Sequence, residues 1–268
     1  MTNEHRPDEL AGAIAEAAHQ LRAATRVVVF TGAGMSADSG IATFRDALTG
    51  LWARFDPQAL ATAEGYEADP PLVWGWYQSR RQQVMLAQPN AGHHAVAQLQ
   101  RRRPGWRVVT QNVDDLHERA AAAAGITGPA TIHLHGSLLA ARCHHCALPF
   151  TLPPGVPDEP AGGRHLDPPR CTACGGPVRP GVVWFGEALP RAAWAQAEAA
   201  VRGCDAMLVV GTSGVVYPAA GLTQLALSQG KPVWVIDPDA DAAGGHPLLH
   251  HLMGRAAELL PLLAAAIG

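Results

Sequence analysis

The stretch Arg26-Val-Val-Val-Phe-Thr-Gly-Ala-Gly-Met-Ser36 decides the fold class of this chain. A continuous apolar run that ends in glycines, with helical sequence beyond it, is typical of a strand–helix junction in a parallel sheet, whose strands are buried on both faces. The stretch therefore predicts a short buried strand over residues 26–30 and a tight turn at Gly32 and Gly34.

Further apolar runs of strand length follow along the chain, and helical stretches separate most of them. Alternating strands and helices favour a doubly wound α/β fold with a parallel sheet. The other expected strands are residues 106–110, 131–135, 206–210 and 232–236. The expected helices are residues 7–24, 91–102, 113–124, 191–201 and 219–228.

The composition of the 268-residue chain is that of a compact globular protein, with 48% hydrophobic and 16% charged residues. Its formal net charge of −3 provides no overall field that would attract nucleic acid or a membrane surface. No apolar run approaches the ~18 residues that a membrane-spanning helix needs, and the polar residues 1–8 lack a signal-peptide core. We therefore expect a cytoplasmic protein, in which paired cysteines are more often metal ligands than disulfides.

Four cysteines occur in two Cys-x-x-Cys pairs, and their thiolates would complete the tetrahedral shell of one structural Zn²⁺ ion. The alternative is that they are free buried cysteines, which the paired spacing disfavours. His144 and His145 lie inside the first pair and are expected to be exposed rather than ligands, and Cys204 is expected to be a small core residue. The predicted ligands are Cys143, Cys146, Cys171 and Cys174.

Two segments interrupt the alternation of strands and helices. Residues 46–89 contain helical stretches, prolines and aromatic residues but no convincing strand, and residues 138–180 contain the paired cysteines. We expect these insertions to form together a small helical and zinc-binding domain. Residues 1–45, 90–137 and 181–268 would then form a Rossmann-like nucleotide-binding domain.

The glycine turn indicates a nucleotide site, although a glycine turn alone is a weak signal. Gly32 and Gly34 would let the backbone approach phosphate oxygens, and Ser36 would add a hydroxyl donor. The turn lacks the Gly-Lys-Ser/Thr ending of a Walker A loop. No acidic residue ends a second strand about twenty residues further on, where a hydride-transferring dehydrogenase would bind ribose. Phe44 and Arg45 follow instead, close to the expected phosphates.

Several motifs in a fixed order together resemble the sirtuins, the NAD-dependent protein lysine deacylases. The resemblance extends from about residue 25 to residue 237 and includes the four cysteines. The ordered set is far more specific than any one of its members. The other matching motifs are Gly32-Ala-Gly-Met-Ser36, Gly40-Ile-Ala-Thr-Phe-Arg-Asp46, Thr110-Gln-Asn-Val-Asp-Asp-Leu-His117, His135-Gly136, Gly181-Val-Val-Trp-Phe-Gly-Glu187 and Gly211-Thr-Ser213.

The resemblance implies an NAD site and one structural zinc ion. By resemblance, Gln111 and Asn112 contact the NAD ribose, and Asp114 contacts the nicotinamide carboxamide. Asn112 and Asp114 are therefore counted among the catalytic residues. The remaining expected cofactor-binding residues are Gly32, Ala33, Gly34, Ser36, Phe44, Arg45, Gly211, Thr212, Ser213 and Asp237.

The resemblance also implies the reaction and its general base. The acyl oxygen attacks the ribose carbon as nicotinamide leaves, His135 accepts a ribose hydroxyl proton, and the acyl group ends on ADP-ribose. The ordinary pKa of histidine, about 6.5, suits this proton transfer. His133 is the alternative, because residues 133 and 135 of a strand share a face; the glycine after His135 favours His135 by resemblance. By resemblance, a strand that pairs with an extended substrate peptide contains the expected substrate-binding residues, which are Val183, Phe185, Gly186 and Glu187.

Two positions depart from the sirtuin pattern. Ala42 replaces the usual proline, which is expected to loosen the loop that carries Phe44 and Arg45. Asp237 stands where many members have asparagine near the adenine ribose, and its carboxylate can still accept hydroxyl hydrogen bonds.

Tyr77 and Arg80 give the clearest indication of the acyl group. They are three residues apart, so on a helix they share a face. The Tyr-x-x-Arg pair resembles that of sirtuins that prefer succinyl, malonyl or glutaryl groups. A guanidinium can bind a carboxylate through two charge-assisted hydrogen bonds, and a phenol hydroxyl can add a third. The alternative is a solvated Arg80 beside Arg81, with Tyr77 as a packing residue.

Other classes of function remain as alternatives: an NAD-dependent deacetylase without acidic preference, an NAD-linked oxidoreductase, or a non-catalytic NAD- and zinc-binding module. Nucleic-acid binding is unsupported, because the cysteine-containing insertion has scattered arginines without a dense basic run or interleaved aromatic residues. The expected partners are acyl-lysine proteins or peptides, and the default oligomeric state is a monomer.

Overall fold

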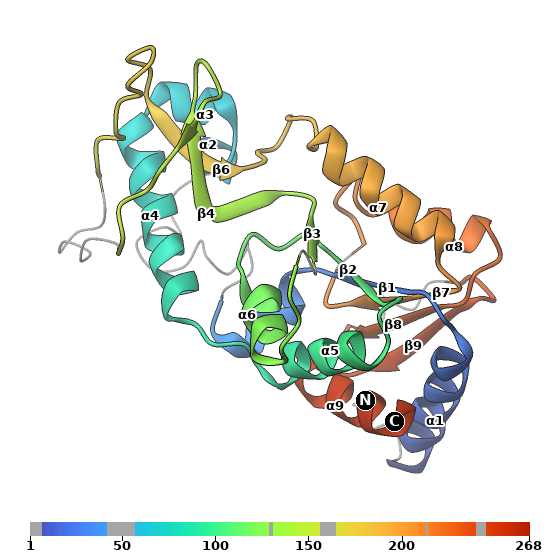
Figure 1. The fold of residues 1–268 in the computed structure, drawn as a ribbon. Coiled ribbons are helices and arrows are strands. Elements are labelled where there is room, and N and C mark those ends of the chain that lie inside the picture. Colours follow the sequence, from blue (N-terminus) through green and yellow to red (C-terminus); the bar gives the residue numbers. More distant parts are fainter. Residues whose placement is uncertain (1–6, 42–56, 129–130, 156–164, 213, 240–244) are drawn as a thin grey trace, which may run out of the picture.

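The computed structural model describes residues 7–41, 57–128, 131–155, 165–212, 214–239 and 245–268. A six-stranded sheet with strand order β3-β2-β1-β7-β8-β9 organises the larger part of the chain, and every neighbouring pair of strands is parallel (Figure 1). The doubly wound parallel sheet is therefore confirmed. The strands are β1 (Val27–Thr31), β2 (Arg107–Thr110), β3 (Thr131–His133), β7 (Ala206–Val210), β8 (Val233–Asp237) and β9 (Leu249–Met253).

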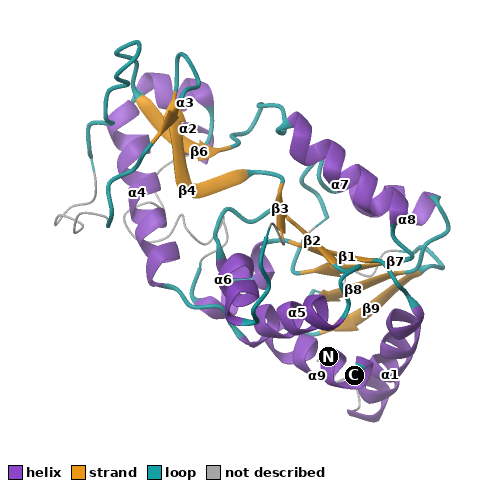
Figure 2. Ribbon diagram, in the orientation of Figure 1, coloured by secondary structure: helices purple, strands orange, loops and turns teal. Residues whose placement is uncertain are grey.

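Helices cover both faces of this sheet, which Figure 2 shows between two helical layers. One face packs on α1 (Pro7–Ala23), α5 (Ala91–Arg102) and α9 (Ala256–Ile267). The other face packs on α7 (Arg191–Gly203) and α8 (Gly221–Ser228). Successive residues of β1 alternate between the two cores, as side chains of a strand must. Burial on both faces explains the uninterrupted apolar runs of the central strands.

A smaller unit lies beside the sheet (Figure 1). It contains an antiparallel sheet of order β5-β4-β6, with β4 (Gly136–Cys143), β5 (Pro149–Phe150) and β6 (Val178–Val182). Three helices lie beside this small sheet in Figure 1; they are α2 (Pro57–Leu60), α3 (Ala63–Ala68) and α4 (Pro70–Leu86). A cluster of buried aromatic and aliphatic side chains joins α4 to this sheet; among its members are Tyr66, Trp76, Tyr77, Val182 and Trp184.

Two expectations about secondary structure are corrected, and one strand was missed. The helix expected from residue 113 is α6 (Leu116–Ala123), which begins where the Leu116 N–H donates to the Asp114 carboxylate at 3.1 Å. The strand expected over residues 131–135 ends at His133. β9 was not predicted, because its Leu-His-His-Leu-Met sequence resembles neither an apolar run nor an alternating one.

The strand order places a topological switch point between β1 and β7. From β1 the chain builds the sheet outward through β2 and β3, and it then returns to β7 on the other side of β1. Doubly wound folds bind ligands in the crevice beyond the carboxyl ends of the strands at such a point. The short 3₁₀ helices η1 (Ala33–Met35) and η2 (Ala37–Ser39) follow β1 at this position.

Candidate active site

The predicted turn at Gly32 and Gly34 meets a second glycine turn, which begins at Gly211 after β7, at the switch point. The Gly32 N–H donates to the Val210 carbonyl at 3.0 Å, and the Gly34 N–H donates to the Gly211 carbonyl at 2.9 Å. A Cβ on Gly34 would lie 2.7 Å from the Gly211 Cα, and Gly211 itself has φ +59. The glycines are therefore required for contact between the turns. Both N–H groups donate to backbone carbonyls, so any contact with phosphates would use another part of the turn, and the expected role of Gly32 and Gly34 there stays a prediction.

The loop after β2 places its polar side chains against the first turn. The Asn112 amide donates to the Ser36 hydroxyl at 3.1 Å, and that hydroxyl donates to the Asp114 carboxylate at 3.0 Å. All three residues are buried. The Gln111 amide donates to the Thr212 hydroxyl at 2.8 Å, which joins the loops after β2 and β7 across the end of β1. Residues 36, 111, 112, 114 and 212, which were predicted to bind cofactor, are thus brought together.

Two buried histidines beneath this group were missed by sequence reasoning. The His93 and His117 rings have centroids 4.8 Å apart. The His117 Nε2 lies 3.1 Å from the Thr31 hydroxyl, which donates to the Thr110 hydroxyl at 2.8 Å. Burial lowers the pKa of each histidine to about 3, so both are neutral near pH 7. They act as fixed hydrogen-bonding groups rather than as proton acceptors.

His133 and His135 have different surroundings, although the strand pattern could not distinguish them. The His135 Nδ1 lies 2.9 Å from the Gln111 carbonyl, and its Nε2 has no hydrogen-bond partner among the described residues. The His133 Nδ1 lies 3.1 Å from the Asn112 carbonyl, and its Nε2 lies 2.8 Å from a carboxylate oxygen of Glu118. His133 therefore has both ring nitrogens occupied.

The pKa values of the two histidines shift in opposite directions. Burial lowers the pKa of His135 below its ordinary value, against the raising effect of its bond to Gln111. Burial also opposes the charged form of His133, but the hydrogen bond and charge of Glu118 raise the pKa of His133 overall. Near neutral pH His135 is thus a neutral imidazole with an open Nε2, while the surroundings of His133 favour its charged form.

The segment after β6 forms a turn beside His135. The Val183 N–H donates to the His135 carbonyl at 2.9 Å, and the Phe185 N–H donates to the Ala61 carbonyl at 2.9 Å. The Glu187 carboxylate accepts from Arg179 at 2.5 Å and 2.8 Å and from the Trp184 N–H at 2.9 Å. The Glu187 side chain therefore holds the turn together, which is a role that the sequence did not predict. The Phe185 side chain is 52% exposed and Gly186 has φ +83.

Tyr77 and Arg80 lie on α4, as predicted. The Tyr77 hydroxyl accepts a hydrogen bond from the Trp184 Nε1 at 2.9 Å, which leaves its own proton available for donation. Burial raises the pKa of Tyr77 to about 12, so the hydroxyl stays neutral. Burial lowers the pKa of Arg80, while the charges of Tyr77 and Asp114 act in the opposite direction. Arg80 is therefore within electrostatic reach of both Tyr77 and Asp114.

Arg81, the neighbour of Arg80 on α4, is not solvated. Its side chain is buried, and its guanidinium donates to the Pro153 carbonyl at 3.0 Å and the Gly155 carbonyl at 3.2 Å. The adjacent arginines of α4 thus have separate environments, since Arg81 holds the proline-rich loop of the second insertion.

The paired cysteines form one cluster whose four Sγ atoms all lie within 4.8 Å of one another. The Sγ distances are 3.4 Å for Cys143–Cys174, 3.5 Å for Cys174–Cys146 and 3.7 Å for Cys146–Cys171. A tetrahedron with Zn–S bonds of about 2.3 Å has edges of about 3.8 Å, so the cluster fits one Zn²⁺ ion with four thiolate ligands. Cys204 is buried apart from the cluster, as predicted.

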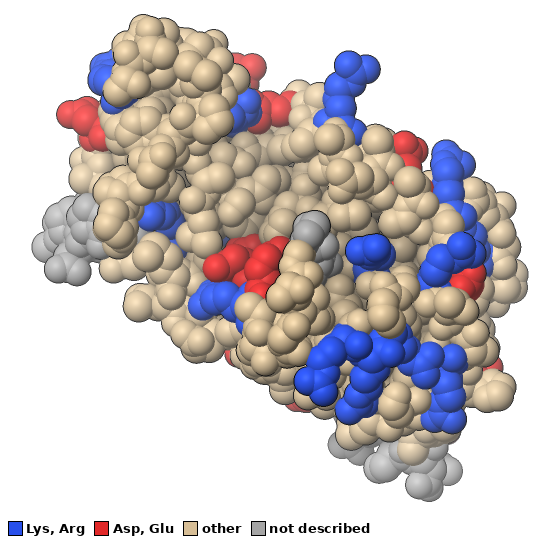
Figure 3. Space-filling view, viewed as in Figure 1, with Lys and Arg blue, Asp and Glu red and all other residues tan. Residues whose placement is uncertain are grey.

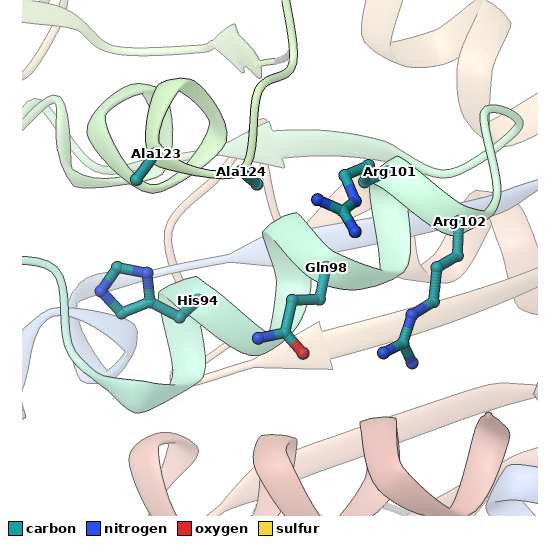
Figure 4. A pocket seen from close by; sticks show the side chains of 6 residues that line it. All are labelled: His94, Gln98, Arg101, Arg102, Ala123 and Ala124. Carbon is teal, nitrogen blue, oxygen red and sulfur yellow. The ribbon is translucent and has the colours of Figure 1, made fainter.

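A separate cavity of about 310 Å³ opens between α5 and α6. Figure 4 shows the side chains of α5 along it and the alanines at the end of α6 beside it. Figure 3 shows positive side chains gathered on this face of the molecule. The lining residues include none of the predicted site residues; they are His94, Gln98, Arg101, Arg102, Ala123 and Ala124.

The remaining expected site residues divide into two groups. Asp237 ends β8, next to β7 at the carboxyl edge of the sheet, and its carboxylate accepts the Asp239 N–H at 2.9 Å. Phe44, Arg45 and Ser213 lie outside the described residues, as does Ala42.

The family model that matches this chain is that of the Sir2 family, over residues 32–218. The chain belongs to the Sir2 family. Among its Sir2 relatives, a protein of Methylococcus capsulatus named NAD-dependent protein deacylase is 53% identical, over 92% of this chain and 94% of the relative. A protein of Pseudomonas aeruginosa named NAD-dependent protein deacylase 1 is 56% identical, over 91% of this chain and 94% of the relative.

A solved structure described as a Sir2 homolog–NAD complex matches this chain with a TM-score of 0.78 and 38% identity, covering 100% of this chain and 96% of the other. The fold of this Sir2 family member is thus shared with an NAD-bound relative. Its own switch point, with buried polar side chains of Ser36, Asn112 and Asp114 at the carboxyl edge of the sheet, fits a dinucleotide. No helix in the described part of the chain has the length and apolar character to cross a membrane.

Proposed function

We propose that this chain is a cytoplasmic NAD-dependent protein-lysine deacylase that prefers acyl groups ending in a carboxylate, such as succinyl and malonyl. Its products would be the free lysine, nicotinamide and the acyl ester of ADP-ribose. Membership of the Sir2 family, with relatives named deacylases at more than half identity, supports the deacylase reaction. The surroundings of Tyr77 and Arg80 support the acyl preference.

His135 is the general base in this proposal. Its Nδ1 faces a carbonyl, which can only accept, so the ring proton lies on Nδ1 and the Nε2 lone pair is open. Because burial lowers the pKa of His135, the imidazole is neutral at pH 7 and can accept a ribose hydroxyl proton. His133 cannot take this role near neutral pH, since Glu118 and the Asn112 carbonyl occupy both of its nitrogens.

The cofactor would bind at the switch point between β1 and β7. When bound, NAD supplies the ribose carbon that receives the acyl oxygen. Gln111 and Asn112 would contact the ribose, and Asp114 would accept from the nicotinamide carboxamide. The Ser36 hydroxyl fixes the orientation of the Asp114 carboxylate before the cofactor arrives. The other residues proposed at the cofactor are Gly32, Ala33, Gly34, Phe44, Arg45, Gly211, Thr212, Ser213 and Asp237.

The acyl pocket would lie between α4 of the first insertion and the segment after β6. The neutral Tyr77 hydroxyl, oriented by Trp184, still has a proton to donate. The Arg80 guanidinium, which shares a helix face with Tyr77, would bind the carboxylate of the acyl group through two charge-assisted bonds. A neutral acetyl group has no carboxylate and could form neither of these charge-assisted bonds.

The substrate would be an extended acyl-lysine segment of a protein that pairs with the backbone near Val183 and Gly186. Insertions 46–89 and 138–180 would together form the small domain that frames one side of this channel, with the zinc ion stabilising it. The exposed Phe185 lies at the turn where such a segment would enter. We propose that the protein is a monomer. We propose neither a nucleic-acid partner nor a membrane partner.

The proposal is tested with the wild-type protein and a single lysine peptide carrying either a succinyl or an acetyl group. Nicotinamide release and peptide mass are followed with and without NAD. We expect NAD-dependent removal of both groups, with the higher kcat/KM for succinyl. Equal turnover would favour the alternative, an NAD-dependent deacetylase without acidic preference. No turnover of either peptide, with NAD binding retained, would favour a non-catalytic binding module.

A further inference from the structure

His133 connects three elements that meet at the cofactor loop, and neither the proposed reaction nor the resemblance gives it a role. The residue ends β3, its Nδ1 lies 3.1 Å from the Asn112 carbonyl after β2, and its Nε2 lies 2.8 Å from Glu118 on α6. One imidazole therefore links a strand, a loop and a helix. The loop that it contacts carries Gln111, Asn112 and Asp114.

The hydrogen-bonding partners of His133 fix its protonation state. A carbonyl oxygen only accepts, so the Nδ1 that faces Asn112 carries a hydrogen. An ionised carboxylate also only accepts, so the Nε2 that faces Glu118 carries a second hydrogen. An imidazole with two N–H groups is a cation. The pKa of His133 is raised and that of Glu118 is lowered, in keeping with this ion pair.

Asn112 is held at three points, and His133 provides one of them. The Asn112 N–H donates to the Thr110 hydroxyl at 3.0 Å, its side-chain amide donates to Ser36 at 3.1 Å, and its carbonyl accepts from His133. The first two bonds join neutral groups. The third has a charged donor, and such charge-assisted hydrogen bonds are the stronger class. Loss of the His133 charge would weaken the hydrogen bond to the Asn112 carbonyl. The Asn112 side chain, which faces the proposed cofactor site, would then be held less firmly.

We propose that His133 and Glu118 form a charged clamp that positions Asn112 and Asp114 for NAD. This inference rests on the proposed NAD site, and it assigns the pair a positioning role rather than a catalytic one. The charged and titratable groups that face His133 are Glu118 and His117 of α6 and Asp114 of the loop. Burial raises the pKa of Asp114 overall, and the charge of His133 opposes this shift, so the clamp reduces the cost of the ionised carboxylate.

The clamp has a direct pH consequence. NAD affinity should be full while His133 is protonated, and it should decline as pH rises through the raised pKa of His133. Replacement Glu118→Gln keeps the shape of the pair, since the amide N–H₂ can donate to a neutral Nε2, but it removes the charge that holds the proton. The decline should therefore begin at lower pH in Glu118→Gln than in the wild type.

The experiment measures three quantities for the wild type, Glu118→Gln and His133→Gln. They are the binding of NAD by calorimetry across pH 6–9, the KM for NAD with kcat, and the histidine ring nitrogens by NMR. We expect Glu118→Gln to weaken NAD binding at pH 7.5 by about tenfold, which corresponds to ~1.4 kcal/mol, with kcat nearly unchanged. His133→Gln should weaken binding and abolish the alkaline decline. Glu198→Gln, which removes the exposed Arg202–Glu198 pair on α7, is the matched control and should change nothing.

Two results would overturn the clamp: a wild-type His133 ring that loses its second proton below pH 6.5, or unaltered NAD affinity and pH dependence in Glu118→Gln. A wild type that binds NAD but removes no acyl group would contradict the proposed function alone. The calorimetric and NMR measurements would still decide the clamp in that case.

Discussion

His133 and His135 bind successive carbonyls of the same loop, His135 that of Gln111 and His133 that of Asn112, yet only His133 has a carboxylate at its second nitrogen. Glu118 therefore favours the charged form of His133, whereas His135 lacks such a partner among the described residues and stays a neutral imidazole. Environments that separate the pKa values of neighbouring groups are a means of assigning acid, base and structural roles.

The first prediction follows from this division. His135→Ala should lower kcat for deacylation by about 10²–10⁴-fold, because no other described group near the ribose position has an open basic nitrogen. NAD binding and zinc content should persist. Turnover kinetics combined with calorimetry and zinc analysis would check this. A His135→Ala protein that retained wild-type kcat would exclude His135 as the base.

Contact between the glycine turns leads to a stability prediction. Gly211→Ala puts a Cβ about 2.4 Å from the Met35 nitrogen at a residue with φ +59, so the free energy of unfolding should fall by more than about 1 kcal/mol. Gly12→Ala is the matched control. It lies exposed within α1 with nothing within 4 Å of the added Cβ, and it should stabilise the protein by about 0.5–1 kcal/mol. Urea denaturation of both variants measures the difference, and equal effects would refute the packing role of Gly211.

The buried neutral histidines predict that the folded protein loses stability in acid. The folded-state pKa of His117 is lowered to about 3, so between about pH 3 and 6.5 the unfolded chain binds a proton there that the folded chain does not. Stability should therefore fall as pH decreases through this range. The contribution of His117 is about 1.4 kcal/mol per pH unit, and His117→Gln should remove that part of the slope. Urea titrations at pH 6 and pH 4 test the difference, with the exposed His94→Gln as control. An unchanged slope in His117→Gln would contradict the neutral buried state.

The cysteine cluster predicts one zinc ion per chain. Cys146→Ser should lower the zinc content and destabilise the small sheet, because a structural zinc ion contributes directly to folding. Cys204→Ala is the internal control, since this buried cysteine lies outside the cluster and should leave the zinc content at one per chain. Elemental analysis and thermal unfolding measure both. A wild-type protein purified without chelators that contained no zinc would argue against the site.

Much of the fold could be predicted because its signals are local. The run at residues 206–210 is apolar at every position since β7 is buried on both faces, and α5 has the predicted bounds because Asn90 caps its start. β9 has a single buried position, Leu252, so its sequence carries little strand signal. A strand at a sheet edge is determined by its neighbour more than by its own composition.

The candidate site could be predicted as a set of residues but not as a set of roles. Cysteine spacing alone was enough for the metal cluster, because the ligand geometry is encoded within short turns. The choice between His133 and His135 depends on Gln111, Asn112 and Glu118, which lie on other elements. His93 and His117 went unnoticed for the same reason, since their partners are distant in sequence.

The acyl preference is the central claim, and Arg80→Met tests it most directly. The kcat/KM for succinyl-lysine and acetyl-lysine forms of one peptide is measured for the wild type, Arg80→Met and Arg80→Lys. We predict that the wild type prefers succinyl and that this preference falls by at least about 100-fold in Arg80→Met, while acetyl turnover is kept. Arg80→Lys should be intermediate, because lysine retains the charge but cannot form the bidentate hydrogen bonds of a guanidinium. A succinyl-to-acetyl ratio that is the same in all three proteins would contradict the account.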